Sequence, residues 1–293
     1  MGELNQIPHI DEIAHHGVFH GAAEKKPATF QERSASQNKI VPSLEEAIRR
    51  TGLRDGMTIS FHHHFRNGDH IINQVVALTK MGFRNLTLAP SSLSAVHAPL
   101  IEAIRSGVIT HIETSGMRGE LAEQVSRGLI DCPVVFRSHG GRASAIRSGE
   151  LHIDVAFLGA PSCDPYGNAN GYSRDDESGI ACGSLGYART DAKYADNVII
   201  ITNHLVPYPN APWAIPEYDV DYVVLTDDIG DPKGIMSGAT RYTKDPKELL
   251  IAKTAANVIE AAGYLYDGFS MQMGSGGASL ATARFLRQKM LDQ

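Results

Sequence analysis

Apolar and polar positions alternate along the chain with two different periods. The segment 43–53, SLEEAIRRTGL, has apolar residues at helical spacing, and Ser43 precedes Glu46 at the spacing of a capping box. The next segment, DGMTISF at 55–61, alternates apolar and polar residues as a strand does. Helical spacing returns in DHIINQVVALTKMG at 69–82. The pattern therefore predicts a helix, a strand and a second helix in succession.

The same alternation of elements continues as far as residue 230. We expect strands at 83–92, 108–116, 132–141, 153–164, 195–206 and 220–230, and helices at 97–107, 119–129 and 142–149. Strands that alternate with helices of this length are typical of an α/β domain with a mainly parallel sheet and flanking helices.

Polar segments follow six of the predicted strands, at the carboxyl ends of the strands, where α/β sheets bind ligands. They read HHHFRNGD, APSS, TSGMRG, RSHGG, GAPSCDPYGNANG and TNHLVPYPN. Each alone is an ordinary loop, but six at one edge of a sheet favour an enzyme. The candidate substrate-binding residues in these segments are His62, His63, His64, Arg66, Asn67, Ser91, Ser92, Ser115, Arg118, His139, Gly140, Gly141 and Asn168.

The three consecutive histidines need their backbone placed before they can be interpreted. At the end of a strand, His62 and His64 point to one side and His63 to the other. Such a run makes a poor three-ligand metal cage, so we predict no metal here. Two interpretations stay open. The histidines pack or hydrogen-bond within the loop, or they contact a carboxylate-rich substrate beside Arg66.

The other candidate loops are also open to two interpretations. Arg118 stands between glycines, where a guanidinium either binds a carboxylate or phosphate or is a solvated turn residue. The segment RSHGGR offers Arg137, His139 and Arg142 with the same ambiguity. DPYGNANG is rich in turn-forming residues, and Asn168 is a ligand candidate only in second place. The sequence holds no Gly-x-Ser-x-Gly motif and no plausible Cys–His pair.

The C-terminal part of the chain repeats the pattern of its first domain. Residues 254–273 match 44–61: a predicted helix leads to Asp-Gly and then to an alternating segment, here FSMQM, that predicts a strand. The loop GSGG and a predicted helix follow. One parallel strand and one helix cannot bury both faces of a new sheet. We therefore expect a second domain that is only begun.

The GSGG loop is a candidate for binding an anion or an oxyanion. Its residues are Gly274, Ser275, Gly276 and Gly277, and their amides precede a predicted helix. A simple tight turn is the alternative. The predicted organisation is an extended N-terminal arm at 1–41, a first α/β domain at 42–245, and a linker helix with the start of a second domain at 246–293.

Composition limits the classes of partner. The chain has 293 residues and a formal net charge of -6, which argues against nucleic acid as a partner. No apolar run approaches the ~18 residues that span a membrane. Cys132, Cys163 and Cys182 are odd in number and lack paired spacing, as expected in a reducing cytoplasm.

Taken together, the motifs resemble the citrate lyase alpha chain family. The resemblance is carried by DGMTISFHHHFRNGD, NLTLAPSSLSAVHAPLIE, TSGMRG, SHGGRASAIRSGELHIDVAFLGAPSCDPYGNANG, CGSLGYA and GSGGASLA. These segments run in order from about Pro42 to the end of the sequence. The resemblance implies a CoA-transferase fold of two similar α/β halves, of which this chain contains the first and the start of the second. Family members are longer, so activity is expected to need the missing half.

The resemblance implies citrate CoA-transferase activity. In that reaction citryl replaces acetyl on the thioester of an acyl carrier subunit, and acetate is released. The implied cofactor is a CoA thioester: acetyl-CoA, citryl-CoA or the CoA-derived prosthetic group of the carrier. The implied partners are the beta (citryl lyase) and gamma (acyl carrier) subunits and further copies of the chain. We assign citrate carboxylates to Arg66 or Arg118, and the pocket wall to the histidines.

Two alternatives to this function are kept. One is a different acyl-CoA transferase or thioester hydrolase of the same fold. The other is a non-catalytic scaffold on which the carrier subunit docks.

Overall fold

The computed structural model describes residues 33, 38–62, 65–75, 81–172, 182, 185–235, 242–274 and 276–292. The chain divides into two compact units, Met1–Pro232 and Lys233–Gln293. Among the described residues, no helix is long and apolar enough to cross a membrane.

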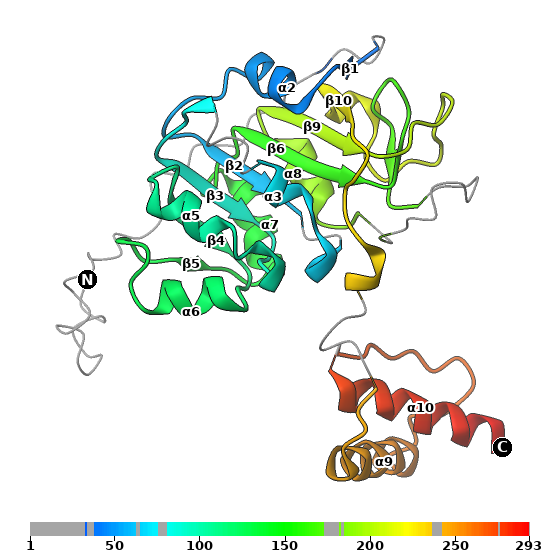
Figure 1. Ribbon diagram of the computed structural model, residues 1–293. Coiled ribbons are helices and arrows are strands. Elements are labelled where there is room, and N and C mark those ends of the chain that lie inside the picture. Colours follow the sequence, from blue (N-terminus) through cyan, green and yellow to red (C-terminus); the bar gives the residue numbers. More distant parts are fainter. Residues whose placement is uncertain are drawn as a thin grey trace. The chain divides into compact units, whose positions relative to one another are not determined.

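Unit 1 is built on one parallel sheet of eight strands (Figure 1). The strands lie in the order β1-β10-β9-β6-β2-β3-β4-β5, and every described pairing between them is parallel. Their bounds are β1 Ile40–Val41, β2 Thr58–Phe61, β3 Leu86–Pro90, β4 Ile109–Thr114, β5 Val135–Phe136, β6 Val155–Ala160, β9 Asn197–Thr202 and β10 Tyr222–Leu225. The short strands β7 Ser162–Cys163 and β8 Ala169–Asn170 form a separate antiparallel pair.

Helices connect these strands, as the sequence predicts. The α-helices of unit 1 are α2 Leu44–Arg50, α3 Ile71–Val75, α5 Leu100–Arg105, α6 Glu120–Ser126, α7 His139–Ser148 and α8 Ala188–Tyr194. Short 3-10 helices are η3 Arg66–Gly68, η4 Ala95–His97, η5 Glu217–Asp219 and η6 Pro232–Gly234. The predicted cap of the first helix is present, because the Ser43 hydroxyl accepts a hydrogen bond from the Glu46 amide at 3.2 Å.

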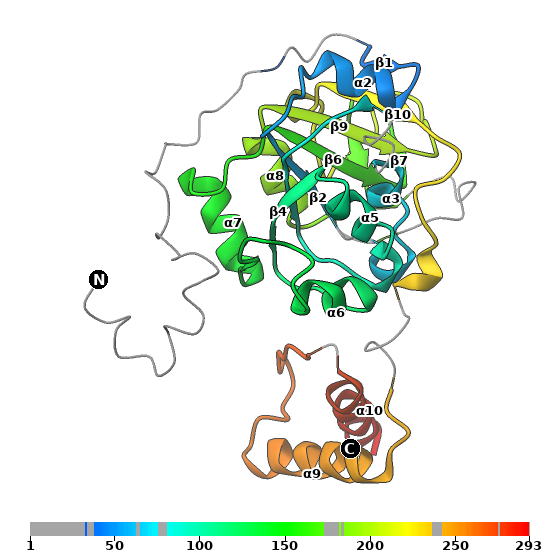
Figure 2. The same ribbon diagram turned by 60° about the vertical axis from the view of Figure 1, so that its left-hand side comes forward.

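Helices cover both faces of the sheet (Figures 1 and 2). On one face, Leu158 of β6 and Ile200 of β9 pack in a cluster with α7 and α8. On the other face, Phe61 of β2 stacks on Phe157 of β6 with ring centroids 5.3 Å apart. Because both faces are buried, all six residues of β6 are apolar or glycine and fully covered. The expected mainly parallel α/β fold is confirmed.

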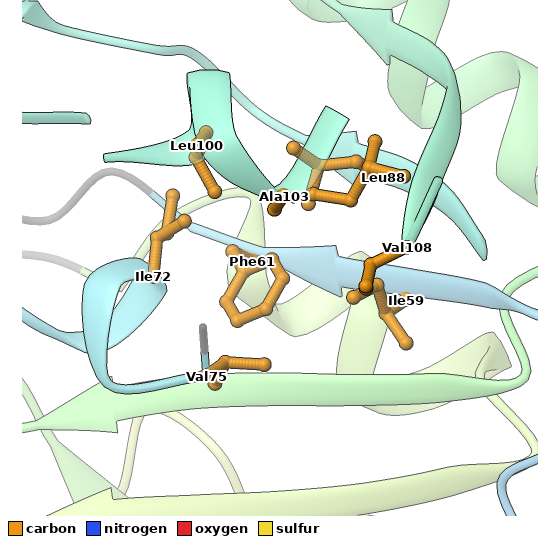
Figure 3. A pocket seen from close by; sticks show the side chains of 9 residues that line it. Ile59, Phe61, Ile72, Val75, Leu88, Leu100, Ala103 and Val108 are labelled. Carbon is orange, nitrogen blue, oxygen red and sulfur yellow. The ribbon is translucent and has the colours of Figure 1, made fainter. Parts of the chain in front are cut away.

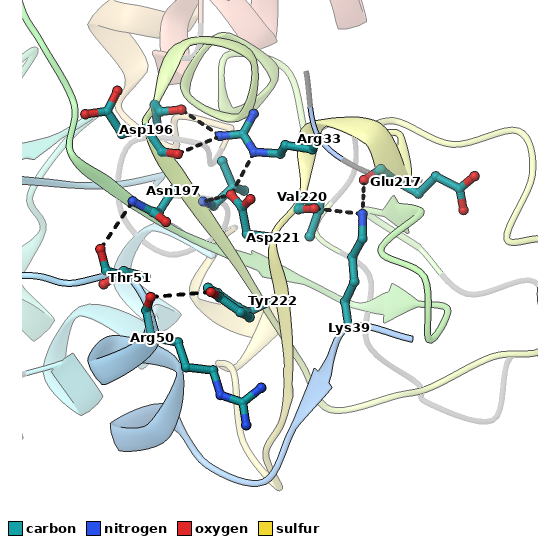
Figure 4. Close-up of polar contacts among 12 residues, drawn as sticks. Arg33, Lys39, Arg50, Thr51, Asp196, Asn197, Glu217, Val220, Asp221 and Tyr222 are labelled. Carbon is teal, nitrogen blue, oxygen red and sulfur yellow. Dashed lines mark hydrogen bonds and ion pairs between the residues drawn. The ribbon is translucent and has the colours of Figure 1, made fainter. Parts of the chain in front are cut away.

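The segment before α2 is fastened to the far edge of the sheet (Figure 4). The Arg33 guanidinium donates to a carboxylate oxygen of Asp221 at 2.7 Å. The Lys39 ammonium donates to the carbonyl oxygens of Glu217 and Val220, at 2.5 and 2.8 Å. Burial lowers the pKa of Lys39. These contacts precede β1, which pairs with β10 and completes that edge.

Unit 2 consists of two helices and the segment between them. Helices α9 Pro246–Ala261 and α10 Gly277–Asp292 pack against each other. The predicted helices are therefore confirmed, but the strand predicted in 269–273 is wrong, because these residues have no strand structure. A strand requires a neighbour for its backbone groups, and unit 2 has no described strand to supply one.

Candidate functional site

The candidate site lies at the carboxyl ends of the neighbouring strands β2, β3 and β4. Strand β2 ends at Phe61, and His62 follows directly. His63 and His64 lie outside the described residues, so the predicted facing of the three histidines stays a prediction.

The loop that follows, residues 65–70, is held between buried anchors. Phe65 and Asp69 are each 1% exposed, whereas Arg66 and Asn67 between them are exposed. The φ of Arg66 is 52°, in the left-handed region, which costs a non-glycine residue roughly 1–2 kcal/mol. Such strain persists only where the surrounding structure holds it. The loop therefore presents two polar side chains from a fixed backbone.

A buried histidine–aspartate pair joins this loop to the loop after β3. The Nε2 atom of His97 lies 2.9 Å from Oδ2 of Asp69, and the two side chains are 0% and 2% exposed. Nδ1 of His97 accepts a hydrogen bond from the Ser94 amide at 2.9 Å. The ring proton therefore belongs on Nε2, which donates to the carboxylate. Oδ1 of Asp69 accepts from the Ile71 amide at 3.1 Å.

Further hydrogen bonds hold the same two loops together. Oδ1 of Asn67 accepts from the Val96 amide at 3.2 Å, and the Asn73 amide group donates to the Val96 carbonyl at 3.0 Å. The Ser91 amide donates to the carbonyl of Phe61 at 3.0 Å. The β2 and β3 loops are thus one connected surface.

The segment after β10 closes over the first loop. Gly230 pairs with Asp69 in an antiparallel bridge, and the Asp231 amide donates to the Gly68 carbonyl at 2.8 Å. The φ of Gly230 is 147°, and a Cβ there would lie 2.5 Å from the Gly68 carbonyl oxygen and 2.9 Å from the ring of Phe65. Only glycine allows this close approach.

The loops after β3 and β4 are joined in the same way. The amide and hydroxyl of Ser115 both donate to the carbonyl of Ser91, the amide at 3.3 Å. The Leu93 amide donates to the Gly116 carbonyl at 2.8 Å, and the Ser92 hydroxyl reaches the same oxygen at 3.4 Å. Three predicted serines therefore lie together beside the β2 loop.

The predicted arginines of the next loops differ in their surroundings. Arg118 is exposed, two residues after Gly116. Arg137 donates to Glu113 and to Glu150, each at 2.9 Å. Burial alone would lower the pKa of Arg137, but the hydrogen bonds to these carboxylates raise it. The side chain of Arg137 therefore forms ion pairs within the protein, whereas that of Arg118 is exposed at the carboxyl ends of the strands.

Helix α7 begins with three predicted residues, His139, Gly140 and Gly141. The Ser138 hydroxyl caps it by accepting from the Gly141 amide at 3.0 Å. His139 is exposed, with its ring centroid 5.5 Å from that of Tyr187. The structure places these residues after β5, at the end of the sheet beyond β4.

Arg142 lies inside the protein. Its guanidinium donates to both carboxylate oxygens of Asp191, at 2.8 and 2.6 Å, and to the Ala89 carbonyl at 2.7 Å. Arg142 is 3% exposed and Asp191 is 0% exposed. This pair fastens α7 to α8 and β3.

Asn168 lies apart from the other candidates, in the turn between β7 and β8. It is 2% exposed. Its amide group donates to Asp164 at 2.8 Å and to Glu217 at 3.3 Å, and its Oδ1 accepts from the Glu217 amide at 2.9 Å. The turn chemistry that the sequence favours is thus present, and the ligand role of Asn168 stays a prediction.

The GSGG loop belongs to unit 2. Gly277 begins α10, and the Gly276 carbonyl accepts from the Leu280 amide at 3.0 Å. Ser275 lies outside the described residues. The predicted role of Gly274 and its neighbours in binding an oxyanion stays a prediction.

Sequence reasoning did not single out Asp69, His97 or Gly230. Asp69 and His97 are 28 positions apart, and both lie within segments predicted as helices. A usable signal was present for Asp69 alone, because it stands at the first position of its predicted helix, where Asp commonly caps.

An apolar pocket lies in the core between strands β2, β3 and β4 and helices α3 and α5 (Figure 3). Phe61, Ile72, Val75 and Leu100 are among its nine lining residues, all of them hydrophobic. A pocket without polar groups does not suit a carboxylate. The polar loops at the carboxyl ends of β2, β3 and β4 are therefore the better candidate for binding an anion.

One group of possible metal ligands lies at the opposite, amino-terminal ends of the strands. Among the described residues, ligand atoms of His152, Asp154 and Asp196 lie within 4.8 Å of one another. Nε2 of His152 is 2.9 Å from Oδ2 of Asp196. These residues precede β6 and β9, away from the strand-end loops.

The fold is a CoA-transferase-like α/β fold. An acyl-CoA transferase from Escherichia coli O157:H7, solved as a thioester complex with CoA, shares the fold alone. The TM-score is 0.50 at 14% identity, and the match covers 77% of this chain and 56% of that one.

The model of the family described as citrate lyase, alpha subunit (CitF) matches residues 37–293. The chain belongs to this family, and the resemblance found in the sequence is confirmed. It is 57% identical over 263 residues to the citrate lyase alpha chain of Escherichia coli (strain K12), which covers 89% of this chain and 51% of the relative.

A solved structure is also similar over nearly the whole chain. It is an alpha subunit of citrate lyase from Streptococcus mutans in complex with citrate, with 50% identity and a TM-score of 0.84. The match covers 98% of this chain and 57% of that one. The chain spans about half the length of the curated relatives it matches.

Proposed function

We propose that the chain supplies the citrate-binding part of a citrate CoA-transferase, the alpha subunit of citrate lyase. One observation carries the proposal: a relative that is 50% identical over 98% of this chain was solved with citrate bound. The strand-end loops described above offer the chemistry that a tricarboxylate needs, which is exposed guanidinium groups, those of Arg66 and Arg118.

In the proposed reaction, a carboxylate oxygen of citrate attacks the carbonyl carbon of an acetyl thioester, the carbon–sulfur bond breaks, and a mixed acetyl–citryl anhydride forms with release of the thiolate. The thiolate then attacks the citryl carbonyl carbon, so that a citryl thioester forms and acetate leaves with the oxygen from citrate. The reaction requires the two reactants to be held together and water to be kept out. Arg66 or Arg118 would hold citrate carboxylates, and His62 to His64 would line the pocket.

The thioester belongs to the CoA-type substrate or to the prosthetic group of an acyl carrier. We propose the gamma subunit as that carrier and the beta subunit as the enzyme that cleaves the citryl thioester. A cytoplasmic location and assembly with further copies of the chain complete the proposal. Cys132 and Cys163 are free thiols, which suits a reducing compartment.

The test is acyl exchange between acetyl-CoA and citrate, followed as acetate and citryl-CoA. It compares this chain with one extended to the length of its relatives. Activity in the extended chain, lost in Arg66→Gln but kept in the surface control Arg49→Gln, supports the proposal. No exchange in either chain, even with the carrier supplied, contradicts it and favours a scaffold that docks the carrier.

A further inference from the structure

We propose that Asp69 and His97 act as a positioning pair for Arg66. Their hydrogen bond holds the loop 65–70 in the strained backbone form that presents Arg66 to a polycarboxylate ligand. The inference rests on the proposed function, which supplies the ligand, but the backbone effect can be measured without any ligand.

The burial of the pair shows that it fixes geometry. Neither side chain reaches solvent, at 2% and 0% exposure. A buried carboxylate costs several kcal/mol unless its hydrogen bonds are made, and Asp69 makes them to His97 Nε2 and to the Ile71 amide. Removing one partner leaves the other buried and unpaired. The pair is therefore compatible with one arrangement of the two loops.

The tautomer of His97 fixes which partner donates in the hydrogen bond between His97 and Asp69. The Ser94 amide, 2.9 Å from Nδ1, requires an acceptor there and leaves the proton on Nε2. Nε2 must therefore meet an acceptor, and Asp69 provides it at 2.9 Å. An amide nitrogen in place of that carboxylate oxygen would put two donors face to face.

The strain at Arg66 connects the pair to the exposed surface. The Asp69 amide donates to the Arg66 carbonyl at 3.3 Å, and the Gly68 amide donates to the carbonyl of Phe65 at 2.9 Å. With Phe65 and Asp69 both buried, Arg66 is held at a φ of 52°. Release of Asp69 would let Arg66 return to the right-handed region near a φ of about -60°. Its side chain would then leave the loop in a different direction.

Two substitutions of His97 separate positioning from simple packing. In His97→Gln, the side-chain amide can still donate to Asp69 from the place of Nε2. In His97→Asn, the shorter side chain can accept from the Ser94 amide at the place of Nδ1 but cannot reach Asp69. If His97 only fills space, the two variants behave alike.

The experiment measures citrate affinity by calorimetry and amide hydrogen exchange in residues 66–69, using the whole chain. Asp69→Asn and His97→Asn are expected to weaken citrate binding by about tenfold, the scale of one lost hydrogen bond to a charged group. Exchange at 66–69 is expected to rise in the same two variants. His97→Gln should restore both values to within about threefold of wild type. His152→Gln, in an exposed His–Asp pair at the other edge, should change neither.

A double-mutant cycle with Arg66→Gly tests whether Arg66 is the group that is positioned. Glycine adopts a positive φ without strain. The effect of Asp69→Asn on citrate affinity should therefore disappear in the Arg66→Gly background. Effects that multiply instead would show that Asp69 acts on the site by another route and would overturn the proposal.

The failures of the two proposals are distinguishable. A wild-type chain that binds no citrate contradicts the proposed function, and hydrogen exchange then decides the positioning pair alone. Equal exchange and equal affinity in His97→Gln and His97→Asn overturn the positioning pair, whether or not citrate binds.

Discussion

At Gly230 an added side chain would clash with backbone. Its φ is 147°, and an added Cβ would meet the Gly68 carbonyl at 2.5 Å. We expect Gly230→Ala to lower the free energy of unfolding by about 3 kcal/mol or more, because the strained φ adds to a backbone clash. Urea denaturation of the variant and the wild type measures this difference in the free energy of unfolding.

Gly52→Ala is the matched control for this prediction. Gly52 also has a positive φ, 67°, but nothing lies within 4 Å of the added Cβ. The expected loss is only about 1 kcal/mol. Equal losses at both positions would show that the segment after β10 does not press on the β2 loop.

Asp219 gives stability a dependence on pH. Burial raises the pKa of its carboxyl, although nearby cations such as Arg33 and Lys193 act in the opposite direction. A carboxyl whose folded pKa is raised contributes stability that is present below the unfolded pKa of about 3.9 and is lost as the pH rises through the folded pKa. Asp219→Asn should therefore unfold at higher urea concentration than wild type at pH 7.

That advantage of Asp219→Asn should shrink as the pH falls below about 4, where the wild-type carboxyl is protonated in both states. Asp131→Asn, at an exposed position, controls for the change in net charge. A constant difference between Asp219→Asn and wild type at all pH values would contradict the prediction.

At the scale of elements, the pair Arg142–Asp191 holds α7 and α8 against the sheet. Arg142→Met should cost about 3–5 kcal/mol, because Asp191 is left as a buried, uncompensated charge. Adding Asp191→Leu should recover part of that loss, since the pair is then replaced by apolar groups. Unfolding in guanidinium chloride, measured for both single variants and the double variant, gives the coupling energy.

Arg50→Met is the control for the buried pair. Arg50 also contacts a carboxylate, that of Glu46 at 2.8 Å, but on the surface of α2. An exposed pair at this spacing contributes only about 0.3–0.5 kcal/mol. Additive losses for Arg142 and Asp191 would show that they do not act as a pair.

The sheet could be predicted from the sequence wherever both faces are buried. The continuous apolar runs of β6 and β9 predict fully covered strands, and the structure contains them. Strand β1 could not be found in this way, because two residues, Ile40 and Val41, are too few to show a period. The segment 269–273 shows the converse: its alternation is real, but a strand needs a partner, which a periodic pattern does not supply.

The candidate site could be predicted only as a place. The sequence predicted that His62, Ser91 and Ser115 follow strands, and the structure places them at the carboxyl ends of β2, β3 and β4. The pair that joins these loops, Asp69 and His97, depends on two loops meeting in space, which local pattern does not encode. Arg142 shows the opposite case. The sequence suggested a polar residue of a ligand-binding loop, whereas in the structure Arg142 is buried and pairs with Asp191.

At the scale of the whole molecule, unit 1 carries its own sheet and core. We expect a chain that ends at Pro232 to unfold cooperatively at the same temperature as unit 1 in the longer chain, because unit 1 is a compact unit with its own sheet and core. Circular dichroism with calorimetry checks this.

A chain that ends at Asp227 is the control. It lacks the closing segment with Gly230, whose bridge to Asp69 is part of unit 1. This chain should unfold at a lower temperature. If the chain ending at Pro232 is equally destabilised, unit 1 depends on unit 2 for its stability.

The edge strand β1 has a consequence for how the protein is made. In the parallel pairing of β1 with β10, Ile40 lies opposite Val223. The ribosome therefore releases this edge about 180 residues before its partner, an interval of roughly 10–40 s at ordinary rates of synthesis. During that time the rest of the sheet can assemble from β2 onward, and Lys39 keeps a charge beside the unpaired edge. The pairing of β1 with β10 is thus a late event in synthesis. In a nascent chain arrested before residue 222, β1 would still be without its partner strand.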